Sequence, residues 1–98
     1  MILHTTSVEY LGDYRLFLSF NNGESGEADL SGRLHGEVFE PLRDKTWFAT
    51  AYQHPMAHTV AWRNGADLAP EYLLDLVHKQ KQNKESGLLL YDSIGLHQ

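Results

Sequence analysis

Apolar and polar residues alternate with a period of two in the segment from Tyr14 to Phe20. One set of alternate positions holds Tyr14, Leu16, Leu18 and Phe20, and the other holds Arg15, Phe17 and Ser19. Side chains of a β-strand point to opposite faces in turn, so this pattern predicts a strand whose first set faces the core. Phe17 is the exception, because it is an aromatic residue on the otherwise polar side.

Two more β-favouring runs flank this segment, Thr5 to Tyr10 before it and Gly26 to Leu30 after it. The links between the runs are Leu11-Gly12-Asp13 and Asn21-Asn22-Gly23, which are rich in residues that favour tight turns. The first thirty residues therefore predict a three-stranded antiparallel meander.

The middle of the chain is less regular. Ser31-Gly32 ends the third strand, and residues 36–44 predict a short helical turn that Pro41 interrupts. Thr46 to Tyr52 and His58 to Trp62 are β-favouring runs separated by turn-forming residues 53–57. This arrangement predicts a second hairpin.

The segment Trp62 to Leu73 combines a strand end, a turn and a helix start. Asn64-Gly65 favours a tight turn, and Pro70 suits the first turn of a helix, with Asp67 or Ala69 as its cap. Apolar residues then recur at helical spacing, which predicts an amphipathic helix from about Pro70 to Gln80.

The order β-β-β-connector-β-β-α indicates an α+β fold, in which an antiparallel meander and a hairpin pack with one main helix in the C-terminal half. We expect a single domain over residues 1–98, with a polar linker at 80–87 and an apolar segment at 88–98. The apolar run consists of Leu88, Leu89, Leu90 and Tyr91. It predicts either an added strand or contact with a second subunit in a homodimer, because both would bury its side chains.

Charge and composition exclude several roles. The net charge of −5 disfavours direct binding to nucleic acid, and most of the acidic excess precedes residue 45. The chain has no cysteine, which excludes disulfides and thiolate chemistry. It also contains neither a long apolar run nor a signal peptide, so we expect a cytoplasmic protein without a membrane span.

Candidate chemistry is sparse. His54 and His58 are four residues apart, but Pro55 between them disfavours the helical geometry with which two histidines share a metal. A crevice containing Asn64 and Asp67, with His58 and Glu71 nearby, would supply an acid, a base and an amide donor. Local roles explain these residues better, since Asp67 suits a cap and Asn64 a turn. We therefore predict no catalytic residue, no metal and no cofactor.

Trp62 has two interpretations. A tryptophan on a hairpin strand is usually a core residue whose N–H finds one partner, whereas an exposed tryptophan is a frequent interface anchor. Core packing is the better prediction. The residues that would face a partner or ligand, if exposed, are Trp62, Asn64, Asp67, Phe17 and Tyr91, and Tyr10 is a further candidate.

One combination of motifs resembles a known family. The chain contains Leu16-x-Leu18-x-Phe20-x-x-Gly23, Asp29-Leu30, Phe39-x-x-Leu42, Phe48 and then Trp62-x-Asn64-Gly65-Ala66-Asp67-Leu68-x-Pro70. Over residues 5–76 this pattern resembles the small bacterial family called domain of unknown function twenty-four forty-two. The resemblance implies a compact α+β domain, sometimes joined to a helix-turn-helix domain and often encoded beside another small protein, as toxin and antitoxin pairs are. It supplies no catalytic residues to carry over.

These observations together favour a protein-interaction or regulatory module, with an antitoxin-like role as one form. Its acidic, partly aromatic surface would cover the functional face of a protein partner, with complementary charge speeding the encounter. A small-molecule or metal-dependent enzyme with a site near Asn64 and Asp67 is the alternative. A homo-oligomer through Leu88 to Tyr91 is a third.

Overall fold

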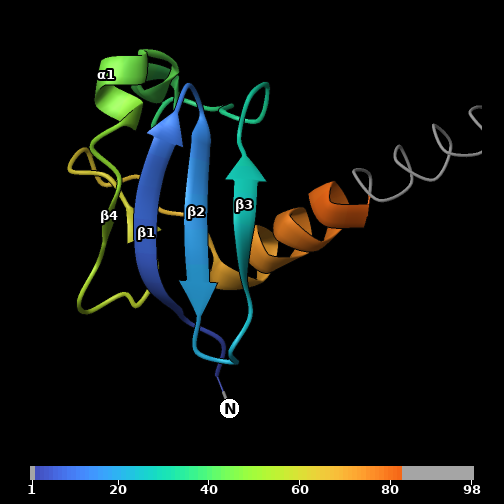
Figure 1. The fold of residues 1–98 in the computed structure, drawn as a ribbon. Helices are drawn as coiled ribbons and strands as arrows, with labels where there is room; N and C mark the ends of the chain where they lie inside the picture. The colour runs from blue at the N-terminus through green and yellow to red at the C-terminus, as the bar shows by residue number, and fades with distance from the viewer. Residues whose placement is uncertain (1, 83–98) are drawn as a thin grey trace, which may run out of the picture.

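Two antiparallel sheets and one long helix make up the fold (Figure 1). In this computed structural model, residues 2–82 are described. The elements in chain order are β1 (Thr5–Gly12), β2 (Arg15–Phe20), β3 (Ser25–Asp29), the 3₁₀ helix η1 (Glu40–Arg43), α1 (Lys45–Phe48), β4 (Tyr52–Gln53), β5 (Val60–Ala61) and a helix over residues 70–82, called the long helix below. The predicted α+β class is confirmed.

The main sheet is the predicted meander, with β2 hydrogen-bonded between β1 and β3. Gly23 lies in the turn between β2 and β3 with φ +89°, and the Glu24 N–H donates to the Asn22 side chain at 3.0 Å. Both features are local properties of the Asn-Asn-Gly sequence, because glycine adopts positive φ without strain and asparagine bonds to nearby backbone. The turn therefore sets the register that places alternate residues of β2 inward.

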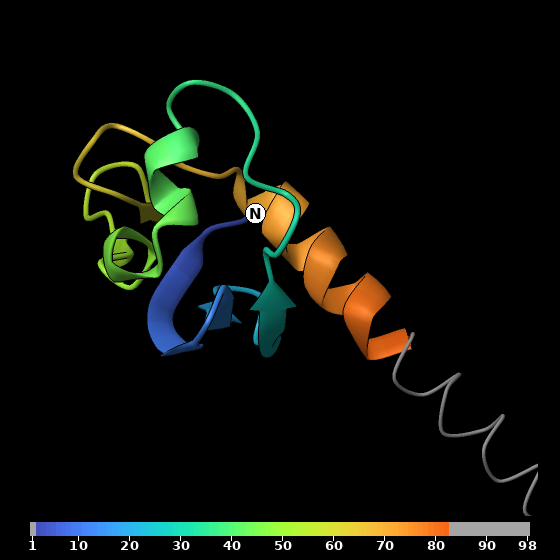
Figure 2. The same cartoon turned by 90° about the horizontal axis from the view of Figure 1, so that it is seen from above.

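The long helix covers one face of this sheet and leaves the other face open (Figures 1 and 2). On the covered side, Leu16, Leu18 and Phe20 of β2 are buried, as the alternation predicts, and Tyr14 is partly buried. They share one core with Leu73, Leu76 and Val77 of the helix. We call the open side the outer face; its central residue is Phe17, with Glu9 and Glu27 opposite it on β1 and β3.

Three contacts dock the long helix along β3. Val77 packs so closely on Gly26 that a Cβ atom at residue 26 would lie 2.5 Å from the valine Cγ1. The Gln80 side-chain amide pairs with the Asp29 backbone in both directions, at 2.8 and 2.9 Å, as a neighbouring strand would. The His78 ring lies 2.6 Å from the Glu24 carboxylate. The helix thus follows the edge of the sheet.

The predicted strand over Thr46–Tyr52 is wrong in its first part. Residues Lys45–Phe48 form the short helix α1, and only Tyr52–Gln53 are extended. The helix begins there because the Asp44 side chain accepts a hydrogen bond from the Thr46 N–H at 2.9 Å. This helix also points Phe48 into the core, and the burial of Phe48 outweighs the strand preference of the segment.

Smaller corrections concern the ends of elements. Pro41 lies in the first turn of η1 and does not interrupt it, as suits a residue without a backbone N–H. The strand predicted over His58–Trp62 is limited to Val60–Ala61, which pairs antiparallel with β4 and confirms the hairpin. The long helix begins at Pro70, as predicted, but continues through residue 82, so the first part of the predicted linker is helical.

The remainder of that linker and the apolar segment 88–98, including the predicted dimer contact through Leu88 to Tyr91, lie outside the described residues. Within residues 2–82, none of the helices combines the length and the apolar character that crossing a bilayer requires.

The contact of Val77 with Gly26 gives a test of helix docking. We expect Gly26→Ala to destabilise the domain by about 1–3 kcal/mol, the usual cost of adding a methyl group to a filled site. Urea unfolding measures this change. Combining it with Val77→Ala removes the clash, so the two losses should not add. Additive losses would show that these residues are not in contact.

The pair of Glu24 and His78 gives a test by pH. Hydrogen bonds from His78 and Asn22 lower the pKa of Glu24 below 4.5. Because the folded pKa is depressed, the resulting stabilisation is present above the unfolded value and disappears as pH falls through the folded value. We expect His78→Ala to raise the pKa of Glu24 towards 4.5 in an NMR titration of its carboxyl carbon. His35→Ala, a change at an exposed histidine in the connector, should leave that pKa unchanged.

Candidate functional site

Trp62 is a core residue with only 1% of its surface exposed. Its Nε1 donates a hydrogen bond to the Phe48 carbonyl oxygen at 3.0 Å, and the two ring centroids lie 5.6 Å apart. The indole therefore has both a packed ring and a satisfied N–H, as core packing requires. The alternative, an exposed tryptophan anchor at this position, does not agree with its burial.

Asn64 stabilises the turn that follows Trp62. The Gly65 N–H donates to the Trp62 carbonyl at 3.1 Å, and Gly65 has φ +92°. The Asn64 side chain accepts from the Ala66 N–H at 3.2 Å and donates to the Val38 carbonyl at 2.8 Å. The sequence assigned Asn64 to the turn for its backbone conformation, but positive φ belongs to Gly65 and the role of Asn64 lies in its side chain.

Asp67 is exposed and does not cap the helix. Its backbone forms an isolated bridge with Ala61, while its side chain has no hydrogen bond or ion pair with any residue of the described chain. The first helical hydrogen bond runs from the Leu73 N–H to the Ala69 carbonyl, so Ala69 is the capping residue. Trp62, Asn64 and Asp67 therefore point to three different surroundings and do not form one site.

His54 and His58, the two histidines considered as metal ligands, have separate contacts. His54 Nδ1 accepts hydrogen bonds from the backbone N–H groups of Met56 and Ala57, at 3.1 and 2.9 Å. The His58 ring stacks on His4 with centroids 4.6 Å apart. Over residues 2–82, no three histidine, aspartate or glutamate side chains are grouped closely enough to hold a metal ion.

The other candidates are dispersed. Phe17 is 38% exposed at the centre of the outer face. Tyr10 has similar exposure, but it packs edge-on to Phe48 at 6.1 Å, at the margin of the covered face. Tyr91 lies outside the described residues.

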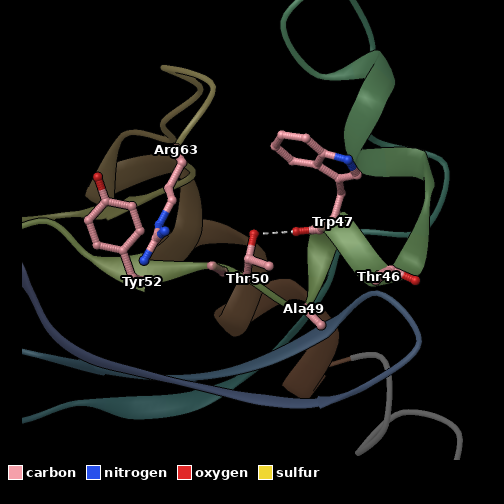
Figure 3. A pocket seen from close by; sticks show the side chains of 7 residues that line it. Thr46, Trp47, Ala49, Thr50, Tyr52 and Arg63 are labelled. Carbon is pink, nitrogen blue, oxygen red and sulfur yellow. Dashed lines mark hydrogen bonds between the residues drawn. The ribbon is translucent and has the colours of Figure 1, made fainter.

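An open groove of about 920 Å³ lies between α1, β4 and the turn after β5 (Figure 3). Trp47, which is 44% exposed, borders one side, and Arg63 and Tyr52 stand together on the other. The remaining lining residues are small, namely Thr46, Ala49, Thr50 and Ala51. The result is a concave surface with two aromatic rings and one guanidinium group.

Local sequence explains why these side chains are available. Trp47 precedes the buried Phe48, and Arg63 follows the buried Trp62. Because neighbouring side chains on α1 and at the end of β5 diverge, burial of one residue turns its neighbour outward. The hydrogen bond between Trp62 and Phe48 then fixes the two exposed neighbours across the groove.

The groove is locally cationic although the chain is acidic. None of its lining residues is an aspartate or glutamate, and none of the ion pairs within residues 2–82 includes Arg63. The Thr50 hydroxyl donates to the Trp47 carbonyl at 2.6 Å, which fixes the groove floor to α1. A guanidinium without a counter-charge among the described residues, beside the exposed ring of Trp47 and the half-buried ring of Tyr52, can bind an anionic group that carries apolar surface.

The sequence did not indicate this groove. The sequence pattern predicts one strand that contains both Trp47 and Tyr52, and Arg63 follows the run His58 to Trp62 that predicts another. The available signal was the adjacent pair Trp47-Phe48, because two neighbouring aromatic residues rarely point into the same core. Their position opposite Arg63 depends on the tertiary fold.

Asn64 and Asp67 form a matched test of the turn. We expect Asn64→Ala to destabilise the domain by about 1–2 kcal/mol, because it removes two hydrogen bonds that tie the turn together. Asp67→Ala should change stability by less than about 0.5 kcal/mol, as is usual for an exposed side chain without partners. Thermal and urea unfolding measure both. Equal losses would contradict the different roles assigned to them.

Comparisons with known proteins identify the family of this chain. The family described as "Protein of unknown function (DUF2442)" matches residues 5–79. A crystal structure described as a "putative DNA binding protein" from Nitrosomonas europaea is similar, with a TM-score of 0.71 and 23% identity over 84% of this chain. The match covers 53% of that protein, so this chain spans about half of its length. No curated protein matches. The match over residues 5–79 covers most of the chain, which therefore belongs to the DUF2442 family.

Proposed function

We propose that this domain is a non-catalytic binding module that takes an acidic, apolar segment of a partner protein into the groove of Trp47, Tyr52 and Arg63. The observation that carries the proposal is the exposed Trp47 facing Arg63, a guanidinium without an ion-pair partner in the described chain. The partner would supply the missing carboxylate and cover the rings.

The residue types of the groove support protein recognition. Tryptophan, tyrosine and arginine are the residues most enriched among interface hot spots, and truncating such a residue typically costs about 2 kcal/mol or more of binding free energy. Aromatic rings contribute large contact areas with few rotatable bonds. Arg63 would fix the orientation of the bound segment, since a guanidinium binds a carboxylate through two parallel hydrogen bonds.

Nucleic acid is the competing ligand, because bases also stack on aromatic rings and phosphates also bind arginine. The similar Nitrosomonas protein carries a DNA-binding description for a chain about twice as long as the matched part. In this chain the groove has a single cation and the net charge is −5, which opposes a phosphate backbone. A protein segment with one or two carboxylates fits this charge distribution better.

The dispersal of Asn64 and Asp67 supports a binding role over the alternative of an enzyme near those residues. A regulatory, antitoxin-like role is a specific form of the proposal, in which the bound segment belongs to the functional face of a neighbouring protein. The groove differs in charge from the acidic surface that the sequence led us to expect, so recognition here would depend on an acidic partner segment.

A peptide titration tests the proposal. The chain has two tryptophans, and only Trp47 is exposed, so quenching by acrylamide reports mainly on the groove. We expect a peptide of alternating aspartate and leucine to bind and to protect Trp47 from quenching. Arg63→Gln should weaken binding about tenfold, which corresponds to the loss of about 1.4 kcal/mol.

Arg33→Gln is the matched control, because it removes the same charge from an exposed residue outside the groove. The same quenching measurement is made with a peptide of alternating lysine and leucine and with a single-stranded oligonucleotide. Protection by the oligonucleotide without protection by the acidic peptide would replace protein by nucleic acid as the ligand. Equal losses in the two arginine variants would show only general charge attraction.

A further inference from the structure

The outer face of the main sheet forms a regular grid. The register places Ser7, Ser19 and Ser25 in one cross-strand row and Glu9, Phe17 and Glu27 in the next. Arg15 reaches diagonally across the face, donating to Glu27 at 3.0 Å and to the Leu11 carbonyl at 3.1 Å. Figures 1 and 2 show no described element in front of this face.

Phe17 is exposed although it lies on the central strand. Its neighbours along β2, Leu16 and Leu18, are fully buried, whereas 38% of Phe17 remains accessible. The ring is flanked by carboxylates on both sides, in the cross-strand positions where side chains lie closest. Glu27 is paired with Arg15, but none of the ion pairs in residues 2–82 includes Glu9.

We propose that this outer face is a second interaction surface, which binds a basic protein segment by placing a lysine or arginine side chain over Phe17 and against Glu9. This surface is separate from the groove of Trp47, Tyr52 and Arg63, which carries the opposite charge. A cation lying over an aromatic ring is attracted by the electrons of the ring, and a neighbouring carboxylate strengthens the attraction. A sheet face that no element of residues 2–82 covers accommodates such a segment without rearrangement of those residues.

Charge selects the kind of partner. By register the face carries the carboxylates of Glu9, Glu27 and Asp29. The guanidinium of Arg15 on this face is already paired with Glu27. An acidic segment would meet Glu9 directly, whereas a basic one would neutralise it. The small serine row beside Phe17 leaves room for the aliphatic part of a lysine or arginine, which itself buries apolar surface.

The experiment uses the full chain, labelled with ¹⁵N, and a peptide of alternating lysine and leucine. We expect amide shifts at Ser7, Glu9, Phe17 and Glu27, and a binding that weakens with added salt. Glu9→Gln and Phe17→Ser should each raise the dissociation constant at least fivefold. Circular dichroism verifies that both variants retain the fold.

Two controls separate this surface from general attraction and from the groove. Glu37→Gln changes the net charge equally at an exposed residue of the connector, and it should leave the dissociation constant within twofold. Arg63→Gln should likewise have no effect on the basic peptide, whatever happens to acidic peptides. Equal losses for Glu9→Gln and Glu37→Gln, or shifts spread away from the outer face, would overturn the proposal.

Discussion

The buried hydrogen bond from Trp62 Nε1 to the Phe48 carbonyl joins the end of α1 to the segment that follows β5. Trp62 directly follows β5 and precedes the Asn-Gly turn, and Phe48 is the last residue of α1. An indole N–H buried without an acceptor would cost about 1–3 kcal/mol, so the bond strongly constrains how the two segments meet. The positions of Trp47 and Arg63 follow from it, since each is the sequence neighbour of one bonded residue.

A second constraint acts on the other side of the core. The close contact of Val77 with Gly26 brings the long helix onto β3, and Gln80 then occupies the backbone groups of Asp29 at the sheet edge. A helix packed in this way can cover only one face of a three-stranded sheet. The exposure of Phe17 is therefore a consequence of helix docking. The residues around it need only be compatible with water or with a bound partner.

These two constraints also explain how far the sequence could predict the fold. The meander and the long helix were predictable because their signals are local: alternation in β2, the Asn-Asn-Gly turn and the apolar spacing after Pro70. The short helix α1 was not, because Thr46, Trp47 and Phe48 favour strands by themselves. The Asp44 cap and the burial of Phe48 decide its conformation, and burial depends on residues distant in the sequence.

The groove was beyond prediction for a related reason. Trp47, Tyr52 and Arg63 lie in α1, in β4 and in the turn after β5. Only Arg63 lies within a recognisable motif, and it occupies the unspecified position between Trp62 and Asn64. The conspicuous motif around Asn64 and Gly65 instead maintains a turn, and its indirect effect is to hold Arg63 outward. Sequence signals of this kind identify residues with strict backbone requirements, whereas binding side chains have few such requirements and leave weaker signals.

Local charge qualifies what the net charge of the chain implies. The value of −5 describes long-range attraction, which falls off within about 10 Å at moderate salt. At contact distance, a partner in the groove would meet Arg63 and no lining carboxylate, whereas a partner on the outer face would meet Glu9 and Glu27. Because these surfaces lie on different elements around one core, a single acidic chain presents surfaces of opposite local charge. Net charge alone therefore does not determine the class of partner.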